Sequence, residues 1–286
     1  MLHRSLLGAI VTAVLVLSAG AARAFDDSKY PNLKGQWNRY IVAGLPGQPS
    51  FDQTKSWGFG QEAPLTGEYK AVLEASMADQ ARGGQGNFTG SGCFAFGMPM
   101  MMAAFYPQEY VITPETTYIL INNADHGRRI FTDGRDWPQD IEPTYQGYSI
   151  GKWIDADGSG RFSVLAVETR GPFKGPRSYD GTGLPLHHDN QSVFKERIYL
   201  DKSDANLLHD EITVIDHALT RPWTVDKRYR RSPNLQPTWL EYVCAESNAQ
   251  VKVGSETYMI SADGYLMPTR KDQPPPDSRY FKQPQR

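Results

Sequence analysis

From Tyr110 onward the chain is a series of short runs rich in β-branched and aromatic residues, with turn residues between them. Runs of this composition are typical of β-strands. The pattern predicts strands at residues 110–113, 117–121, 128–132, 148–154, 162–169, 193–200, 208–216, 223–230 and 240–244. Consecutive hairpins of this kind form an antiparallel meander, which closes into a barrel or packs as a sandwich. We therefore expect an all-β fold.

The region before these strands, from Phe25 to Gly92, is expected to be irregular because prolines and glycines interrupt it. One short helix is predicted from Thr66, whose hydroxyl can cap it, since Tyr69, Val72, Leu73 and Met77 recur at helical spacing. At the other end, residues 271–286 contain three consecutive prolines and are predicted to be a disordered tail. Residues 25–270 are then expected to form a single domain.

The first 24 residues have the features of a signal peptide. Arg4 precedes an apolar run from Leu6 to Ser18, and Ala22-Arg23-Ala24 forms an A-x-A cleavage site before Phe25. A retained anchor is the alternative, but the run is shorter than the roughly 20 apolar residues that span a bilayer. We expect a periplasmic or secreted protein of 286 − 24 = 262 residues without stable membrane insertion.

Cysteine usage and charge narrow the possibilities further. Cys93 and Cys244 are the two cysteines of the chain, and in an oxidising compartment such a pair predicts one disulfide, with two free thiols as the alternative. Removing Arg4 and Arg23 leaves 30 − 2 = 28 basic against 32 acidic side chains, a net charge of −4. Because there is no basic excess, we expect no nucleic-acid partner.

Strand alternation places two charged side chains among apolar ones. One predicted inward face carries Phe194, Glu196, Ile198 and Leu200, and another carries Trp223, Val225, Lys227 and Tyr229. A buried carboxylate or ammonium is costly unless it is paired or used. Two interpretations remain open: a structural ion pair of Glu196 with Lys227 or Arg129, or a functional role.

The densest polar clusters lie at 125–129 and 132–136, which one strand joins. This arrangement could bring His126, Arg129, Asp133 and Arg135 to the rim of the sheet. Histidine can act as acid or base near neutral pH, and arginine can hold a carboxylate or oxyanion. The alternative is a plain turn at Asp133 with solvated arginines.

His187 belongs to a second cluster, in a connection from 171 to 190 that could form a lid. No regular histidine spacing supports a metal site, so no metal is predicted. Met98, Met100, Met101 and Met102 could bind Cu(I), but methionine also fills irregular apolar gaps, which is the favoured interpretation.

Several phrases resemble a large, mostly uncharacterised group of exported bacterial β-rich proteins. They are Asp125-His126 with Arg129, Asp133-Gly134-Arg135, residues 147–153, residues 167–171, Glu196-Arg197 and residues 220–224, together with the segments around Cys93 and Cys244. The resemblance covers Cys93 to Asn248. It implies a single domain and strengthens the disulfide, and it implies no particular activity.

Gly35-Gln36-Trp37 separately resembles the Gly-x-Trp that opens the first strand of lipocalin-like barrels. This resemblance implies a barrel that holds a small apolar ligand, and whether the barrel closes is left open by the sequence. The expected fold is therefore an antiparallel meander forming a lipocalin-like β-barrel, preceded by an irregular N-terminal region.

The leading functional hypothesis is a cofactor-independent periplasmic enzyme that acts on a small hydrophobic or aromatic molecule. Aromatic residues make up 12% of the chain, which suits an apolar pocket, and nucleotide-binding motifs are absent from the sequence. The expected chemistry is the proton transfer of a lyase, dehydratase or isomerase. The candidate catalytic residues are His126, Arg129, Asp133, His187, Glu196 and Lys227, and the candidate substrate contacts are Arg135, Tyr148, Trp153 and Trp223.

In this hypothesis Glu196 or His126 is the base, Lys227, Tyr148 or His187 is the acid, and Arg129 with Arg135 holds negative charge. The alternative is a non-catalytic carrier of an apolar metabolite, in which the polar groups pair with one another. A third possibility is a partner-binding β-sandwich, which would have no enclosed cavity.

Overall fold

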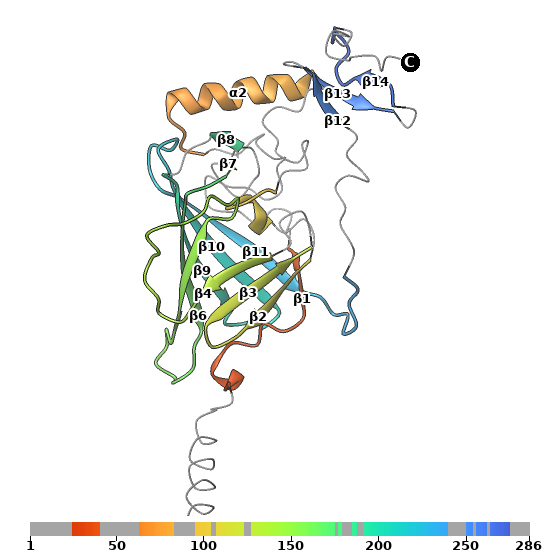
Figure 1. Ribbon diagram of the computed structural model, residues 1–286. Coiled ribbons are helices and arrows are strands. Elements are labelled where there is room, and N and C mark those ends of the chain that lie inside the picture. Colours follow the sequence, from red (N-terminus) through yellow and green to blue (C-terminus); the bar gives the residue numbers. More distant parts are fainter. Residues whose placement is uncertain are drawn as a thin grey trace, which may run out of the picture.

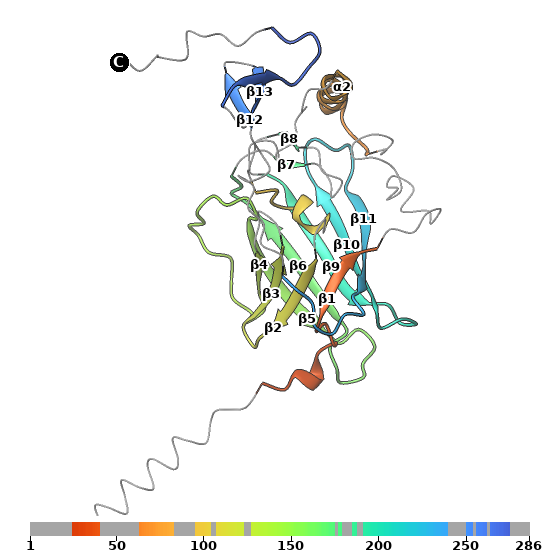
Figure 2. The same cartoon turned by 90° about the vertical axis from the view of Figure 1, so that its right-hand side faces the viewer.

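A ring of nine strands forms the body of the protein (Figures 1 and 2). The computed structural model describes residues 25–40, 63–82, 95–103, 107–122, 127–174, 177–178, 185–187, 191–239, 250–253, 256–261 and 264–274. The strands of the ring are β1 (Gln36–Arg39), β2 (Gln108–Ile112), β3 (Thr116–Ile121), β4 (Gly127–Phe131), β5 (Tyr148–Ile154), β6 (Val164–Arg170), β9 (Val193–Leu200), β10 (Leu207–Ile215) and β11 (Trp223–Arg231). Their order is β1-β11-β10-β9-β6-β5-β4-β3-β2, and β1 also pairs with β2, which closes the ring.

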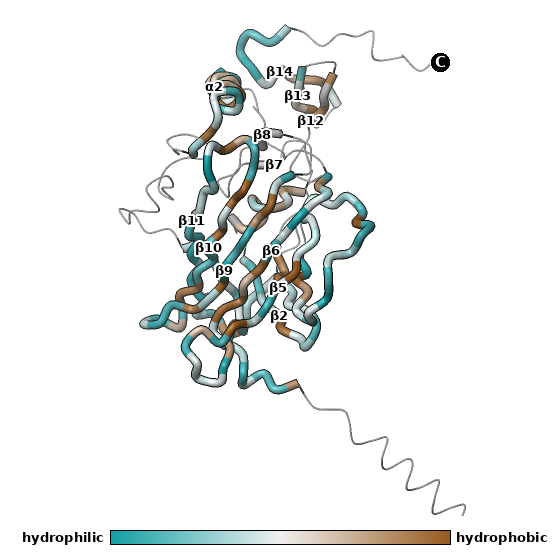
Figure 3. The backbone as a smooth tube through the Cα atoms, turned by 90° about the vertical axis from the view of Figure 1, so that its left-hand side faces the viewer, coloured by the Kyte–Doolittle hydropathy of each residue, from teal (hydrophilic) through white to brown (hydrophobic). Residues whose placement is uncertain are grey.

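The β-rich class expected from the sequence is confirmed. Every predicted strand that falls on described residues coincides with an observed strand to within two residues at either end, whereas 240–244 lies outside the described residues. Hydrophilic and hydrophobic residues alternate along strands such as β6 and β9 (Figure 3). This alternation is what gives each strand one inward and one outward face.

The expectation of an uninterrupted antiparallel meander is wrong at one place, between β4 and β5. These strands are parallel, with Ile130 opposite Ser149 and Phe131 opposite Ile150, while the other pairs in the ring are antiparallel. The physical reason is the long connection at 132–147, which carries the chain back to the end where β4 begins. A tight hairpin cannot do this, because parallel strands need a crossover.

Further strands lie outside the ring. The short strands β7 (Arg177–Ser178) and β8 (Pro185–His187) pair with each other in the connection between β6 and β9. The strands β12 (Gln250–Val253), β13 (Glu256–Ile260) and β14 (Leu266–Pro268) form a separate three-stranded sheet. Residues 271–274, expected as the start of the disordered tail, include Gln273, which is buried and donates to the Thr257 carbonyl at 2.7 Å.

The predicted helix is confirmed as α2 (Gly67–Ala81), which lies at the same end of the molecule as the β12–β14 sheet (Figures 1 and 2). Its Leu73 is buried in the core, and Tyr69 bonds His217 at 2.8 Å. An ion pair of 3.4 Å joins Asp79 of the helix to Arg270 beyond β14. Among the described helices, none combines the length and the apolar character that crossing a membrane requires.

The inward side chains of the ring pack into one core. Its largest fully buried side chains include Trp37, Trp223, Phe194 and Tyr229. Near the end of the ring that faces α2, the 3₁₀-helix η4 (Met100–Ala103) contributes to the core, and Met98, Met100, Met101 and Met102 are all at most 1% exposed. The methionines therefore fill apolar space, as the favoured interpretation predicted.

The opposite end of the ring is covered by residues 25–34, which include the short 3₁₀-helix η2 (Asp27–Lys29) (Figure 1). The Lys29 carbonyl accepts a hydrogen bond of 2.8 Å from the Phe162 amide in the β5–β6 connection. The segment therefore lies across the ends of the strands, where it forms part of a pocket.

Candidate functional site

An ion pair crosses the interior of the ring between Arg128 of β4 and Glu196 of β9. The Arg128 Nη1 donates to Glu196 Oε1 at 2.8 Å and Nη2 to Oε2 at 2.5 Å, and the two side chains are 1% and 0% exposed. Arg128 Nη2 also donates to Ser149 Oγ at 3.1 Å and to Thr169 Oγ1 at 2.7 Å. Both charges are thus paired and hydrogen-bonded, as burial requires.

The identity of this partner corrects one expectation. Arg129 was a candidate partner of Glu196, but it lies on the exposed face of β4, whereas Arg128 shares the inward face with Ile130. Burial alone would lower the pKa of Arg128, but the adjacent Glu196 carboxylate outweighs it and the pKa is raised. Both oxygens of the Glu196 carboxylate are therefore occupied by the Arg128 guanidinium.

A second carboxylate, Asp210 of β10, lies inside the same ring without such a partner. It is 0% exposed, and neither of its oxygens accepts a hydrogen bond within the described part of the chain. Its neighbours in the sheet register are Lys227 of β11 and Ile198 of β9. Burial raises the pKa of Asp210 well above its usual range, and the negative charge of Glu196 raises it further.

Asp210 was not among the sequence-predicted site residues, although the alternation of residues along β10 indicated its inward position. The alternate positions of β10 are Leu208, Ile212 and Val214, all of which are buried. The same alternation that identified Glu196 and Lys227 therefore also places Asp210 inside.

Two tyrosines and a glutamine complete the polar interior. Gln108 Nε2 donates to the Tyr110 hydroxyl at 3.1 Å, and the Tyr229 hydroxyl donates to the Met102 carbonyl at 2.5 Å. Burial raises the pKa of both tyrosines, and the charge of Asp210 raises it further, so both stay neutral. The Gln108 Oε1 is buried and accepts no hydrogen bond from any described residue.

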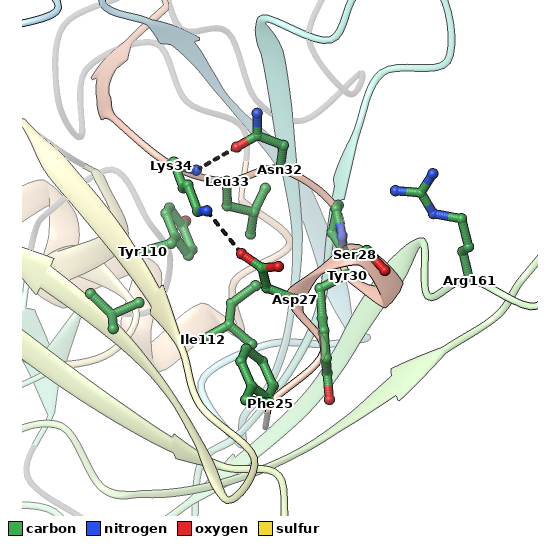
Figure 4. A pocket seen from close by; sticks show the side chains of 12 residues that line it. Phe25, Asp27, Ser28, Tyr30, Asn32, Leu33, Lys34, Tyr110, Ile112 and Arg161 are labelled. Atoms are coloured by element: carbon green, nitrogen blue, oxygen red, sulfur yellow. Dashed lines mark hydrogen bonds and ion pairs between the residues drawn. The ribbon is translucent and has the colours of Figure 1, made fainter. Parts of the chain in front are cut away.

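A pocket of about 510 Å³ lies where residues 25–34 cover the end of the ring (Figure 4). Its apolar lining consists of Phe25, Tyr30, Pro31, Leu33, Tyr110, Val111 and Ile112. Charged groups are also present, and Lys34 Nζ pairs with Asp27 Oδ2 at 2.9 Å. The pocket is therefore mainly apolar with a polar edge, the usual character of a small-molecule site.

Aromatic rings connect this pocket to the core. The Tyr30 ring makes an edge contact with Trp153 at 5.4 Å between centroids and lies 5.0 Å from Phe162. Trp153, a candidate substrate contact, is 7% exposed and donates from Nε1 to Thr117 Oγ1 at 3.2 Å. Trp153 thus does not line the pocket but packs directly behind Tyr30, which does.

The remaining candidates on the sheet lie outside the ring. Arg135 Nη2 pairs with Asp133 Oδ2 at 2.6 Å, Nη1 donates to the Tyr148 hydroxyl at 3.3 Å, and its guanidinium covers the Phe131 ring at 3.8 Å. Tyr148 precedes Ser149, which faces inward, so Tyr148 faces outward. Asp133, Arg135 and Tyr148 come together as expected, but on the opposite face of the sheet from Glu196.

The sequence-predicted site residues are consequently divided by the sheet. Glu196, Lys227, Trp153 and Trp223 belong to the interior, and Arg129, Asp133, Arg135 and Tyr148 belong to the exterior. His126, Cys93 and Cys244 lie outside the described residues, and for His187 the structure describes only the backbone, in β8. The histidine roles and the disulfide stay predictions.

The described part of the chain thus holds two features of interest: a buried polar cluster inside the ring and a pocket at the end that residues 25–34 cover. The function of the protein is therefore inferred from this geometry, because no known protein supported the suspected family resemblance. Comparisons of the chain with protein-family models, with curated proteins and with solved structures found no match.

Proposed function

We propose that this protein is a lipocalin-like carrier that binds a small, mainly apolar molecule at the end of the ring covered by residues 25–34. The observation that carries the proposal is the pocket of about 510 Å³ with its wall of aromatic and aliphatic side chains. Sites for small organic ligands commonly have volumes of about 300–1,000 Å³. The Gly35-Gln36-Trp37 resemblance, which implies a barrel that holds a small apolar ligand, also supports a carrier.

The pairing of the interior charges favours a carrier over an enzyme. A carrier was expected to hold polar groups that pair with each other, and Glu196 is fully engaged by Arg128. The exterior candidates Arg135 and Tyr148 cannot reach the same ligand, because the sheet lies between them and Glu196. The described members of the predicted catalytic set therefore lie on both faces of the sheet.

A cofactor-independent proton-transfer enzyme is the second candidate, and Asp210 favours it. A fully buried carboxyl group without a hydrogen-bond partner is a common feature of catalytic acids and bases. In this version Asp210 replaces Glu196 as the acid or base, and Lys227 is the nearest charged neighbour in register. Recovery of a chemically altered ligand from wild type, but not from Asp210→Asn, would establish it.

We also propose that the protein is exported and that its mature chain begins at Phe25. The basic residue, the apolar run and the A-x-A motif of residues 1–24 support this. Phe25 lines the pocket, so cleavage after Ala24 would place the new α-amino group at the edge of the binding site. Intact-mass measurement of periplasmic protein should give a chain of residues 25–286, and a full-length mass would contradict export with cleavage.

The binding proposal is tested by native mass spectrometry of protein purified from its own periplasm. We expect a co-purifying small molecule in the wild type and its loss in Ile112→Trp, because the larger side chain fills the pocket. Leu120→Trp is the matched control, since Leu120 lies on the exposed face of the neighbouring strand. Equal ligand retention by both variants would exclude this pocket as the binding site.

A further inference from the structure

We propose that Asp210 and Gln108 form the hydrogen-bond-accepting end of the ligand site, so that the ligand is an apolar molecule carrying an O–H or N–H donor, such as an alcohol, a phenol or an amine. This inference rests on the proposed binding function and names the chemical class of its ligand. The body of the ligand occupies the pocket, and its donor group points toward the interior of the ring.

Three buried acceptor oxygens lack a donor among the described residues. Asp210 Oδ1, Asp210 Oδ2 and Gln108 Oε1 accept no hydrogen bond within the described part of the chain, and both residues are 0% exposed. Leaving a buried acceptor unsatisfied destabilises the folded state, so folded proteins supply a partner from the chain, from water or from a ligand.

Several donors of the interior are already committed elsewhere. Arg128 donates to Glu196, Ser149 and Thr169. The Tyr229 hydroxyl donates to the Met102 carbonyl, and Gln108 Nε2 donates to Tyr110. None of these donors is available to Asp210 without breaking a bond that it already makes, so the donor group of a ligand would satisfy Asp210 at no such cost.

The acceptors lie around the same two tyrosines. Gln108 bonds Tyr110 directly, and the charge of Asp210 acts on both Tyr110 and Tyr229. Tyr110 is also part of the pocket lining (Figure 4). Its side chain thus touches the pocket on one side and bonds Gln108 on the other, so a small movement of the Tyr110 ring would open the way from the pocket to the acceptors.

The charges of the interior determine which head group fits. The charge of Glu196 acts against a further negative charge beside Asp210, while Arg128 and Lys227 act in its favour. Because Arg128 is already paired with Glu196, an anionic head group fits less well than a neutral one. A multivalent metal ion is also a poor fit, because among the described residues no group of three or more His, Cys, Asp and Glu side chains could hold one. A neutral or cationic hydrogen-bond donor satisfies the acceptors without these penalties.

The test compares two probes of the same shape, 4-propylphenol and 4-propyltoluene, which differ by a hydroxyl in place of a methyl group. Binding is followed by methyl NMR of the full mature protein, using Leu33 and Ile112 for the pocket and Ile198 and Ile212 for the surroundings of Asp210. We expect both probes to shift the pocket methyls and the phenol to bind up to about tenfold more tightly, since one additional buried hydrogen bond contributes up to about that factor.

Two variants assign this preference to Asp210. In Asp210→Leu the phenol preference should disappear while binding of 4-propyltoluene is retained, and in Asp210→Asn, which keeps one acceptor oxygen, part of the preference should remain. Both variants remove an unpaired buried carboxyl, so neither should unfold the protein.

The outcomes separate the two proposals. Equal affinity of the wild type for both probes, with shifts at Leu33 and Ile112, would overturn the Asp210 inference and leave the binding function intact. It would mean that internal water satisfies the acceptors. The absence of any shift at the pocket methyls with either probe would overturn both.

Discussion

At the scale of single residues, two carboxylates in one interior differ in their surroundings. Glu196 has a bidentate arginine, whereas Asp210 has no hydrogen-bond partner among the described residues. The raised pKa of Asp210 means that the folded state resists its ionisation. Removing this group therefore affects stability differently from removing Glu196.

Replacing Asp210 by Asn should stabilise the protein in a pH-dependent way. Because the pKa of Asp210 is raised in the folded state, its ionisation carries no penalty below the unfolded pKa of about 4 and an increasing penalty as the pH rises above it. Urea denaturation should show Asp210→Asn to be more stable than wild type by about 1–3 kcal/mol at pH 8, with a smaller difference at pH 5.

The exposed Asp136→Asn is the control for this measurement, and its effect should stay within about 0.5 kcal/mol at every pH. If Asp210→Asn raised the free energy of unfolding equally at pH 5 and pH 8, this would contradict the view that Asp210 is a buried acid without a compensating partner.

The sequence allowed some of these residues to be predicted and left others unassigned. Alternation correctly placed Glu196 and Lys227 inside. It also contained the information that Arg128, two residues before the buried Ile130, is the inward arginine of the Arg128-Arg129 pair. What alternation could not give is the partner across the ring, because strands β4 and β9 are not adjacent.

At the scale of elements, the Arg128–Glu196 pair joins β4 to β9 across the interior, with β5 and β6 between them in the sheet. Ser149 and Thr169 on these intervening strands bond the same guanidinium. The Arg128 side chain of β4 thus bonds side chains on three other strands of the ring, and the Glu196 carboxylate is its counter-ion.

Breaking this pair from one side should be costly. Glu196→Gln leaves the Arg128 charge buried without its counter-ion, and we expect a loss of about 3–5 kcal/mol in the free energy of unfolding, measured by urea denaturation. The double variant Arg128→Met with Glu196→Leu should recover most of this loss, because it removes both charges.

Glu168→Gln provides the matched comparison on the outer face. Glu168 pairs with Arg170 and Lys195 in partly exposed surroundings, so its replacement should cost at most about 1 kcal/mol. Similar losses for Glu196→Gln and Glu168→Gln would show that the interior pair is not effectively buried.

Strand positions were predictable because the alternation of polar and apolar residues can be read from a short stretch of sequence. The parallel pairing of β4 with β5 was not, since hydrogen-bond partners depend on the path of the 132–147 connection rather than on the strands. The short β1 was suggested by the Gly35-Gln36-Trp37 resemblance alone, because four residues are too few for a periodic signal.

At the scale of the whole molecule, β1 completes the ring by pairing with both β11 and β2. Trp37 is the central residue of this closure: it is 0% exposed, its Nε1 donates to the Leu33 carbonyl at 2.9 Å, and the Arg231 guanidinium covers its ring at 4.2 Å. The same segment continues into the cover of the pocket at residues 25–34.

Trp37→Ala should therefore weaken both stability and ligand retention. Removal of a fully buried tryptophan costs about 3–5 kcal/mol, which urea denaturation will measure. Asn38→Ala on the exposed face of the same strand should change stability by less than about 0.5 kcal/mol. Comparable effects of the two replacements would mean that β1 is dispensable for closure.

The pairing of β1 with β11 also has a kinetic consequence. Trp37 lies opposite Arg231, so the seam joins the first ring strand in the chain to the last. Contacts between residues so distant in sequence form slowly, because the intervening chain must first lose much of its conformational freedom. During synthesis the ring cannot close until Arg231 has emerged, and an exported chain would gain time to cross the membrane while it is still unfolded.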